Sequence, residues 1–284
     1  MNAPTLPRLE IEDAVRRALR EDLGLVGDLT SNATIPADAR ARVVMNVREE
    51  GVVCGLDVAR AAFAMLDPGL RFEPMRAEGE AVKPGDDLAR IEGDARAVLG
   101  AERVALNFAC HMSGMATLTE RFAREIAHTR ARIVCTRKTL PGLRAFAKYA
   151  VRCGGGSNHR TALHDAILIK DNHVAVAGGV GPAIRAARLY AGHLTKIEVE
   201  VDTLDQLREA LAAGPDVVML DNMGPDELRE GVAIVAGRVP VEASGNVSLE
   251  TVRAIAETGV DMISTSKITM GAPTLDIGLD IAID

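Results

Sequence analysis

The sequence predicts an α/β protein with an N-terminal α+β domain and a C-terminal part built on a parallel sheet. Residues 1–94 mix a helical pattern with short alternating strands, and residues 132–265 alternate apolar strands with helices. A chain of 284 residues is long enough for two domains. Its 48% hydrophobic and 26% charged residues are typical of a globular protein.

The first domain is expected to start with a helix and to continue as an antiparallel sheet. Apolar residues recur at helical spacing in 11–19, whereas 27–36 is predicted to be a loop. Alternating residues in 43–47 predict a strand, and 58–66 has the pattern of a helix. Short strands around a Lys-Pro-Gly-Asp turn are expected in 70–93.

A long helix is predicted for residues 95–127, and Ser113 and Gly114 are expected to interrupt it at a kink or at the join between domains. Leu99, Arg103 and Leu106 recur at helical spacing, so Arg103 is expected on an apolar face. An arginine placed there is more often part of a structural ion pair than of a binding site.

The C-terminal part repeats a strand and a helix. Strands are predicted at 133–136, 166–170, 197–201, 217–221, 239–243 and 262–265. Helices are predicted at 143–152, 182–190, 204–213, 225–236 and 249–258. Such an alternation indicates a parallel sheet, but six units are too few for the usual eight-stranded barrel. The pattern therefore leaves an incomplete barrel and a doubly wound sheet as alternatives.

Charged and hydroxyl residues stand at nearly every strand end. They are Arg137, Lys138, Lys170, Glu200, Asp221, Glu242, Ser244, Asn246, Ser264, Thr265, Ser266 and Lys267. In parallel α/β proteins the carboxyl ends of the strands carry the functional site. Glu200 and Asp221 suit sugar hydroxyls or hydrated Mg²⁺, although isolated carboxylates often have structural roles.

Residues 132–173 are strongly basic, with eight Lys or Arg against two acids in a chain of net charge −7. This clustering of cations predicts an anionic partner, either a small polyanion or nucleic acid. The run 154–160, Gly-Gly-Gly-Ser-Asn-His-Arg, suits an anion but matches neither the P-loop nor the dinucleotide fingerprint. The negative net charge and 2% aromatic content argue against a nucleic-acid binder.

Several motifs together resemble one known family over essentially the whole chain. The most specific are T-R-K-T-x-P-G-L-R at 136–144, K-Y-A-V-R-C-G-G-G-x-N-H-R at 148–160 and L-I-K-D-N-H at 168–173. Supporting motifs are E-V-E-V at 198–201 and E-A-S-G-N at 242–246. In these motifs the sequence resembles quinolinate phosphoribosyltransferases, which are type II phosphoribosyltransferases.

The resemblance implies an N-terminal α+β sandwich over residues 1–114 and an incomplete, six-to-seven-stranded α/β barrel over 115–274. The tail, 275–284, would pack back on the first domain. The implied reaction transfers phosphoribosyl from phosphoribosyl pyrophosphate to quinolinate with decarboxylation. It gives nicotinate mononucleotide, pyrophosphate and CO₂ in de novo NAD biosynthesis. The family further implies Mg²⁺, a homodimer or larger homo-oligomer, and a cytoplasmic location.

The resemblance also implies roles for individual residues. Arg137, His159, Arg160 and Lys170 would bind quinolinate, and Arg103 would reach the site from a neighbouring subunit. Lys138, Lys170, Glu200 and Asp221 would be catalytic, and the two acids would hold ribose hydroxyls and Mg²⁺ through water. Further substrate contacts would come from Thr136, Ser244, Gly245, Asn246, Ser264, Thr265 and Ser266, several of them through backbone N–H groups. The sequence departs from the family at Ser266 and Lys267, where a glycine-containing loop is usual.

Three other functions stay open from the sequence. The first is a paralogous phosphoribosyltransferase with another anionic acceptor. The second is a barrel aldolase or lyase that uses Lys170 as a Schiff base. The third is a non-catalytic nucleic-acid binder. No apolar run is long enough to span a bilayer and no signal segment is recognised, so a cytosolic protein with four reduced, structural cysteines is expected.

Overall fold

The computed structural model describes residues 5–282, which form two compact units. Within these residues, the first unit comprises the chain up to Glu120, Thr139–Gly155 and the segment from Ile268 onward. The second unit comprises Arg121–Lys138 and Gly156–Lys267. No helix of the described chain is long and apolar enough to cross a bilayer.

The first unit is built on an antiparallel four-stranded sheet, as the sequence predicts. Its strand order is β12 (Ile277–Ala282), β1 (Arg40–Val47), β5 (Asp87–Asp94) and β3 (Arg71–Pro74). Val43, Met45 and Val47 alternate along β1 and are buried, so one face of the sheet carries the core. A second small sheet pairs β2 (Gly51–Val52) with β4 (Ala81–Val82).

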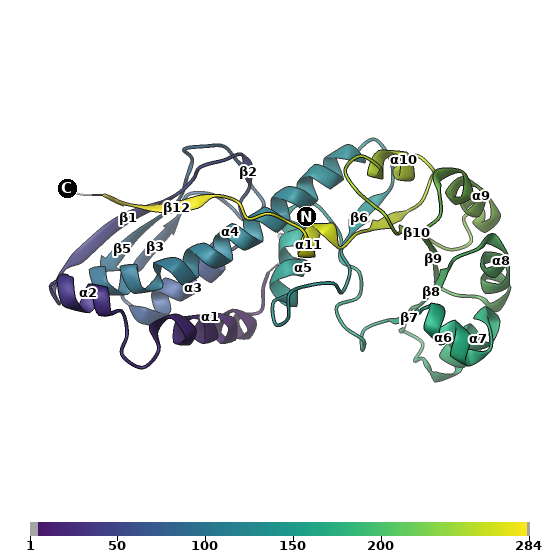
Figure 1. Ribbon diagram of the computed structural model, residues 1–284, viewed down its shortest axis with the longest axis horizontal. Helices are drawn as coiled ribbons and strands as arrows, with labels where there is room; N and C mark the ends of the chain where they lie inside the picture. The colour runs from purple at the N-terminus through teal and green to yellow at the C-terminus, as the bar shows by residue number, and fades with distance from the viewer. Residues whose placement is uncertain (1–4, 283–284) are drawn as a thin grey trace. The chain divides into compact units, whose positions relative to one another are not determined.

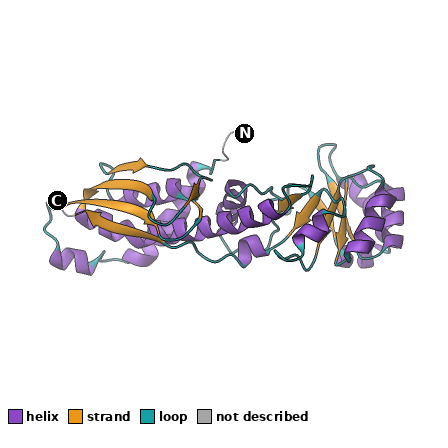
Figure 2. Ribbon diagram, turned by 90° about the horizontal axis from the view of Figure 1, so that it is seen from above, coloured by secondary structure: helices purple, strands orange, loops and turns teal. Residues whose placement is uncertain are grey.

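Helices cover one face of this sheet (Figure 2). They include α1 (Arg8–Leu23), α2 (Leu29–Thr34), α3 (Leu56–Leu66) and α4 (Ala95–Glu125), and α5 (Arg144–Cys153) belongs to the same unit. Val15 of α1, Phe63 of α3 and Val98 of α4 are fully buried and belong to the same hydrophobic cluster as Met45 of β1. The apolar stripes predicted for these helices are therefore their packing faces.

Two local predictions for this unit are wrong. Residues 27–36 contain α2 instead of a loop, because the Asp28 carboxylate caps the helix and accepts the Ser31 N–H at 3.1 Å. The long helix α4 is not interrupted at Ser113 and Gly114. The Ser113 hydroxyl bonds both the N–H and the carbonyl of Cys54, at 2.8 and 3.0 Å, so this residue serves as a tertiary contact on a continuous helix.

The second unit is an open, fully parallel six-stranded sheet (Figure 1). The strand order is β6 (Arg132–Val134), β11 (Met262–Ser264), β10 (Val241–Ser244), β9 (Val217–Asp221), β8 (Ile197–Val201) and β7 (Ile167–Ile169). Strands β7 to β11 are neighbours in chain order, and β6 lies beside β11, so β6 and β7 are the two free edges. This is the incomplete barrel, not the doubly wound sheet.

The connecting helices are α6 (Asp171–Ala177), α7 (Val180–Tyr190), α8 (Leu204–Ala213), α9 (Pro225–Val235) and α10 (Val252–Ala256), and α11 (Lys267–Met270) follows the last strand. Most match the predicted segments, but α6 was not predicted and α10 is shorter than 249–258. Gly231 of α9 lies so close to Leu220 that an added Cβ would stand 2.7 Å from its side chain. Leu220 therefore faces the helices, and Met219 and Asp221 face the opposite, inner side of the sheet.

Two glycines of α4 provide a test of the packing in the first unit. A Cβ at Gly114 would lie 1.9 Å from the Pro273 carbonyl oxygen, whereas one at Gly100 would meet its nearest neighbour, Leu66, at 3.4 Å. We expect Gly114→Ala to lower the free energy of unfolding by about 2 kcal/mol or more through overpacking. Gly100→Ala should be neutral or stabilising by about 0.5–1 kcal/mol because alanine favours the helix. Urea denaturation of both variants measures the difference, and equal effects would contradict the described approach of Pro273.

Candidate active site

The inner side of the second unit carries a ladder of polar residues that the strand register aligns. Ser244 of β10 is level with Asp221 of β9, and one step deeper Glu242 and Glu200 are each level with Met219. Residues level with one another in a parallel sheet point to the same side. The acidic side chains predicted at the strand ends therefore gather on the inner side, at the carboxyl end of the sheet.

Two arginines at this end have buried polar atoms without a partner. The Nε atoms of Arg137 and Arg160 are buried, and neither has a hydrogen-bond acceptor among the described residues. Arg160 donates from its terminal nitrogen to the Ala166 carbonyl at 3.1 Å. Burial lowers the pKa of Arg160, and the positive charge of Arg137 lowers it further. Such a pair is a site for an anion, because an anion would satisfy both the hydrogen bonds and the charge.

Lys170 and Glu200 form an ion pair beside the acidic ladder. The Lys170 ammonium bonds the Glu200 carboxylate, and 46% of the lysine side chain is exposed against 8% of the glutamate's. Lys170 directly follows β7, and its N–H donates to the His173 ring at 3.0 Å. Asp221, at the end of β9, accepts a hydrogen bond from the Asn222 amide at 2.6 Å. Lys138 is exposed, and its N–H donates to the Thr136 hydroxyl at 3.0 Å.

The loop after β10 adopts a backbone conformation that only certain residues allow. Gly245 has a φ of +95°, and a Cβ there would lie 2.2 Å from the Asn222 side-chain oxygen. Asn222 and Asn246 also have positive φ, at 55° and 53°, which asparagine tolerates better than most residues. The Asn222 N–H bonds the Ser244 carbonyl at 2.9 Å. The loops after β9 and β10 therefore hold each other over the strand ends.

The loop after β11 is more enclosed than the sequence suggests. Ser264 and Thr265 are buried, and Ser266 is partly exposed. The Thr265 N–H donates to the Val134 carbonyl at 3.1 Å, and its hydroxyl accepts the Lys267 N–H at 3.2 Å. The N–H groups of Thr265 and Lys267 are thus used inside the protein. Any anion at this loop would need other donors.

His159 lies between two buried glutamates. Its Nε2 atom is 2.9 Å from Glu198 Oε2 and 3.8 Å from Glu242 Oε2. The second oxygen of each glutamate is buried without a hydrogen-bond partner. Burial and the neighbouring Glu198 raise the pKa of Glu242 to about 8, while His159 and the Ser264 hydroxyl favour its charged form. Two carboxylates this close and this buried cannot both be ionised at low cost.

Sequence reasoning missed Glu198 as a site residue and named Glu242 only as a strand end. The signal for Glu198 was present in the alternating Glu-Val-Glu-Val at 198–201, which places it on the same face as Glu200 and one step deeper. What the pattern lacked was the position of His159. That residue comes from a loop 39 residues earlier in the chain.

Arg103 is placed in the first unit. It is exposed on α4, so the expectation that it occupies an apolar face is wrong. It lines a groove of about 660 Å³ together with Asn107 and His111 of the same helix and with the loop at Leu140–Leu143. All these residues belong to the first unit.

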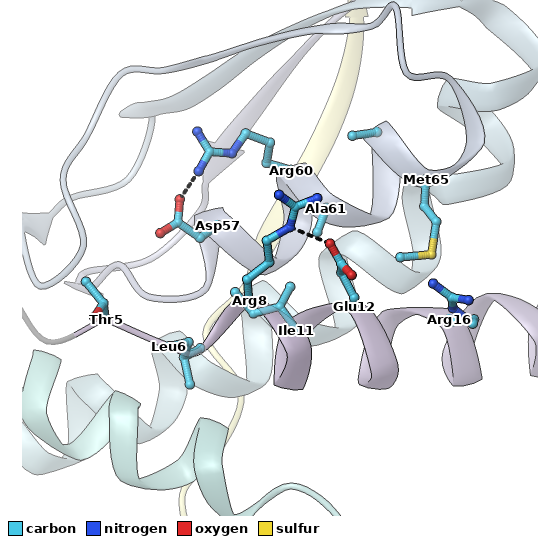
Figure 3. A pocket seen from close by; sticks show the side chains of 11 residues that line it. Thr5, Leu6, Arg8, Ile11, Glu12, Arg16, Asp57, Arg60, Ala61 and Met65 are labelled. Atoms are coloured by element: carbon cyan, nitrogen blue, oxygen red, sulfur yellow. Dashed lines mark hydrogen bonds and ion pairs between the residues drawn. The ribbon is translucent and has the colours of Figure 1, made fainter.

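A second groove in the first unit lies between α1 and α3 (Figure 3). Four of its five charged residues form pairs, Arg8 with Glu12 at 2.5 Å and Arg60 with Asp57 at 2.5 Å. None of the described residues that line this groove has a buried donor without a hydrogen-bond partner, unlike the arginines of the barrel site.

The four cysteines are free thiols. Cys54 and Cys153 lie beside Glu78, and their ligand atoms are all within 4.8 Å of one another. The Glu78 carboxylate accepts the N–H groups of Gly55 at 2.8 Å and Asp57 at 3.3 Å, at the start of α3. Glu78 is therefore a helix cap, and the two thiols pack beside it as structural groups.

The fold and the site together indicate an α/β enzyme with an anion site at the carboxyl ends of the strands of an incomplete barrel. The chain matches two family domains: the quinolinate phosphoribosyl transferase N-terminal domain over residues 28–113 and the C-terminal domain over 115–280. The chain therefore belongs to the quinolinate phosphoribosyltransferase family.

Relatives and solved structures agree with this assignment. The nicotinate-nucleotide pyrophosphorylase [carboxylating] of Mycobacterium leprae is 44% identical over 277 residues, covering 95% of this chain and 96% of that protein. A probable enzyme of the same name from Bacillus subtilis is 39% identical over 97% of this chain and 94% of its own. The solved nicotinate-nucleotide pyrophosphorylase of Francisella tularensis matches with a TM-score of 0.93 at 38% identity, covering 98% of each chain.

The raised pKa of Glu242 predicts a pH-dependent stability. Its folded pKa of about 8 lies above the ordinary 4.5, so the fold favours the protonated form. That contribution is complete below about pH 4.5 and is lost as the pH rises through about 8. We expect Glu242→Gln, which stays neutral, to gain stability relative to wild type as the pH is raised from about 5 to about 9.

Thermal unfolding across this pH range measures the effect. Glu230→Gln, on the exposed surface of α9, is the matched control and should follow wild type. Parallel curves for wild type and Glu242→Gln would mean that the Glu242 carboxyl does not change its charge with folding.

Proposed function

We propose that this chain transfers the phosphoribosyl group of phosphoribosyl pyrophosphate to quinolinate, with loss of CO₂, to give nicotinate mononucleotide and pyrophosphate. Membership of the family supports this reaction, as do the names of the relatives. The observation that carries it is the pair of arginines, Arg137 and Arg160, with buried Nε atoms that lack an acceptor.

Quinolinate suits this pair because it is a pyridine with two adjacent carboxylates. One guanidinium can hold a carboxylate through two parallel hydrogen bonds, and two guanidiniums side by side match two neighbouring carboxylates. Binding of an anion would also offset the burial and the charge of Arg137, which together lower the pKa of Arg160. A monocarboxylate would satisfy only part of the site, so the geometry favours a dicarboxylate acceptor.

The acidic ladder suits the ribose of the second substrate. As pyrophosphate leaves, positive charge develops on the ribose ring, and preorganised carboxylates such as Glu200 and Asp221 would stabilise it. Lys170 and Lys138 would stabilise the negative charge of the departing pyrophosphate. In this proposal the 5′-phosphate lies among Ser244, Gly245, Asn246 and the Ser264–Ser266 loop. Thr136 contacts substrate next to Lys138.

The residues present also fit a magnesium ion. Carboxylate oxygens are the ligands that Mg²⁺ prefers, and Mg²⁺ keeps much of its water shell when a site offers only one or two of them. Glu200 already contacts Lys170, so together with Asp221 it would hold the ion through water. The bound ion would neutralise charge on the pyrophosphate group.

We further propose a cytoplasmic homodimer or larger homo-oligomer in which Arg103 completes the site of a second copy. The exposed position of Arg103 on α4 supports this role, because a long cationic side chain there is accessible to another chain.

The reaction is tested by incubating the protein with quinolinate, phosphoribosyl pyrophosphate and Mg²⁺ and measuring CO₂ and nicotinate mononucleotide together. Equal amounts of the two products are expected. Arg137→Ala and Arg160→Ala should each lower kcat/KM for quinolinate by on the order of 100-fold, because each leaves a buried carboxylate unpaired.

Arg208→Ala, which removes an exposed arginine paired with Asp205 on α8, is the control and should keep wild-type activity. A well-folded wild type that forms neither product would refute the proposed acceptor. A screen of other pyridine and azole dicarboxylates would then follow.

Removing Mg²⁺ with EDTA should abolish product formation, and restoring excess Mg²⁺ should recover it. Glu200→Gln and Asp221→Asn are each expected to raise the Mg²⁺ concentration needed for half-maximal rate, since an amide is a weaker ligand for a hydrated cation. An unchanged Mg²⁺ requirement in both variants would place the ion elsewhere.

A further inference from the structure

Both ring nitrogens of His159 have a close polar neighbour within the second unit. Its Nδ1 atom accepts the N–H of Arg160, with 2.7 Å between the two nitrogens. A ring nitrogen that accepts a hydrogen bond carries no proton, so the proton is on Nε2. This atom is 2.9 Å from Glu198 Oε2, a close contact that is not aligned as a hydrogen bond. The side chain is only 11% exposed. The His159 ring is thus turned toward the two glutamates.

The glutamates that contact His159 are on interior strands of the sheet. Glu198 is on β8 and Glu242 is on β10, and both strands have a neighbour on each side. Both glutamates are buried, and the Ser264 hydroxyl bonds Glu242. Neither glutamate has a place in the reaction proposed above.

The segment that carries Arg160 has no regular secondary structure of its own between residues 158 and 166. Its start is tied to β6, because the Ser157 N–H donates to the Ile133 carbonyl at 2.9 Å. Its far end is a turn in which Asp165 accepts the N–H groups of Thr161 and Ala162 at 2.6 and 2.8 Å. Between these two points, His159 contacts Glu198 and Glu242 on the inner side of the barrel.

We propose that Glu198 and Glu242 are positioning residues that lock the His159 ring and thereby set the direction of the Arg160 guanidinium. This inference rests on the proposed function, in which Arg160 binds a carboxylate of quinolinate. Bidentate binding requires the guanidinium plane to be aligned with the carboxylate, so a support that fixes its backbone improves affinity without touching the ligand. Glu198 also offsets the positive charge of Arg160 directly.

Glu198→Ala and Glu198→Gln separate this role from a general loss of structure. Glu198→Ala should weaken quinolinate binding by about 10-fold or more in calorimetry and leave the KM for phosphoribosyl pyrophosphate within about 2-fold. Glu198→Gln should restore most of the quinolinate affinity, because its amide has the size of the carboxylate and its oxygen can keep the 2.9 Å contact with Nε2. Glu230→Ala is the surface control. Equal losses for both substrates, or no rescue by glutamine, would overturn the proposal.

A double-mutant cycle tests whether the effect passes through Arg160. In an Arg160→Lys background, where the planar guanidinium is gone, Glu198→Ala should cause little further loss of quinolinate affinity. Fully additive losses would mean that Glu198 acts independently of Arg160.

A third measurement does not depend on the reaction. The Nε–H of Arg160 should give a slowly exchanging ¹⁵N resonance in wild type, because the atom is buried. Glu198→Ala should make it exchange faster, and Glu198→Gln should preserve it. If this response is seen in a protein that does not bind quinolinate, the acceptor is wrong and the positioning role stands. If quinolinate binds but the exchange rate of the Arg160 Nε–H is the same in wild type and in both variants, the positioning role is wrong.

Discussion

The second unit depends on the placement of two like charges, Arg137 and Arg160. Both keep their Nε atoms buried without acceptors, and burial together with the charge of Arg137 lowers the pKa of Arg160. This arrangement costs free energy, which the surrounding fold must offset. An anion would complete both the hydrogen bonds and the charge balance, which is why the arginine pair is the strongest indication of function in the chain.

The parallel sheet makes this placement possible. All six strands run in one direction, so their carboxyl ends deliver Arg137, Lys170, Glu200, Asp221 and the loop after β10 to one edge. The loops at that edge are stabilised by close backbone approach, as at Gly245, where a side chain would collide with Asn222. Glu198, one step deeper on β8, and Glu242, level with Glu200, are buried and contact His159. The site therefore combines charged groups at the strand ends with buried glutamates that contact His159.

The sequence predicted the fold class well and some local details poorly. Alternating strands and helices predicted the parallel sheet because short strand segments rich in apolar residues recur at similar spacing between helical segments. Residues 27–36 were mistaken for a loop because a six-residue helix depends on one capping carboxylate more than on an apolar face. Ser113 and Gly114 were mistaken for a break in the helix. The hydrogen bonds of Ser113 and the close packing of Gly114 involve residues far away in the chain, which a local pattern does not show.

By itself, the sequence determined which residue types reach the strand ends. The βα repeat shows where each strand ends, and the charged residues at those positions are read directly from the chain. It also determined the family, through motifs that stand in the same order over the whole chain. Only the tertiary structure decided that the sheet is an open barrel and that Thr265 has already used its N–H. It also decided that His159 is held between Glu198 and Glu242. The reason is that these are contacts between segments far apart in the chain, and their energies depend on distance and burial, which a sequence pattern does not record.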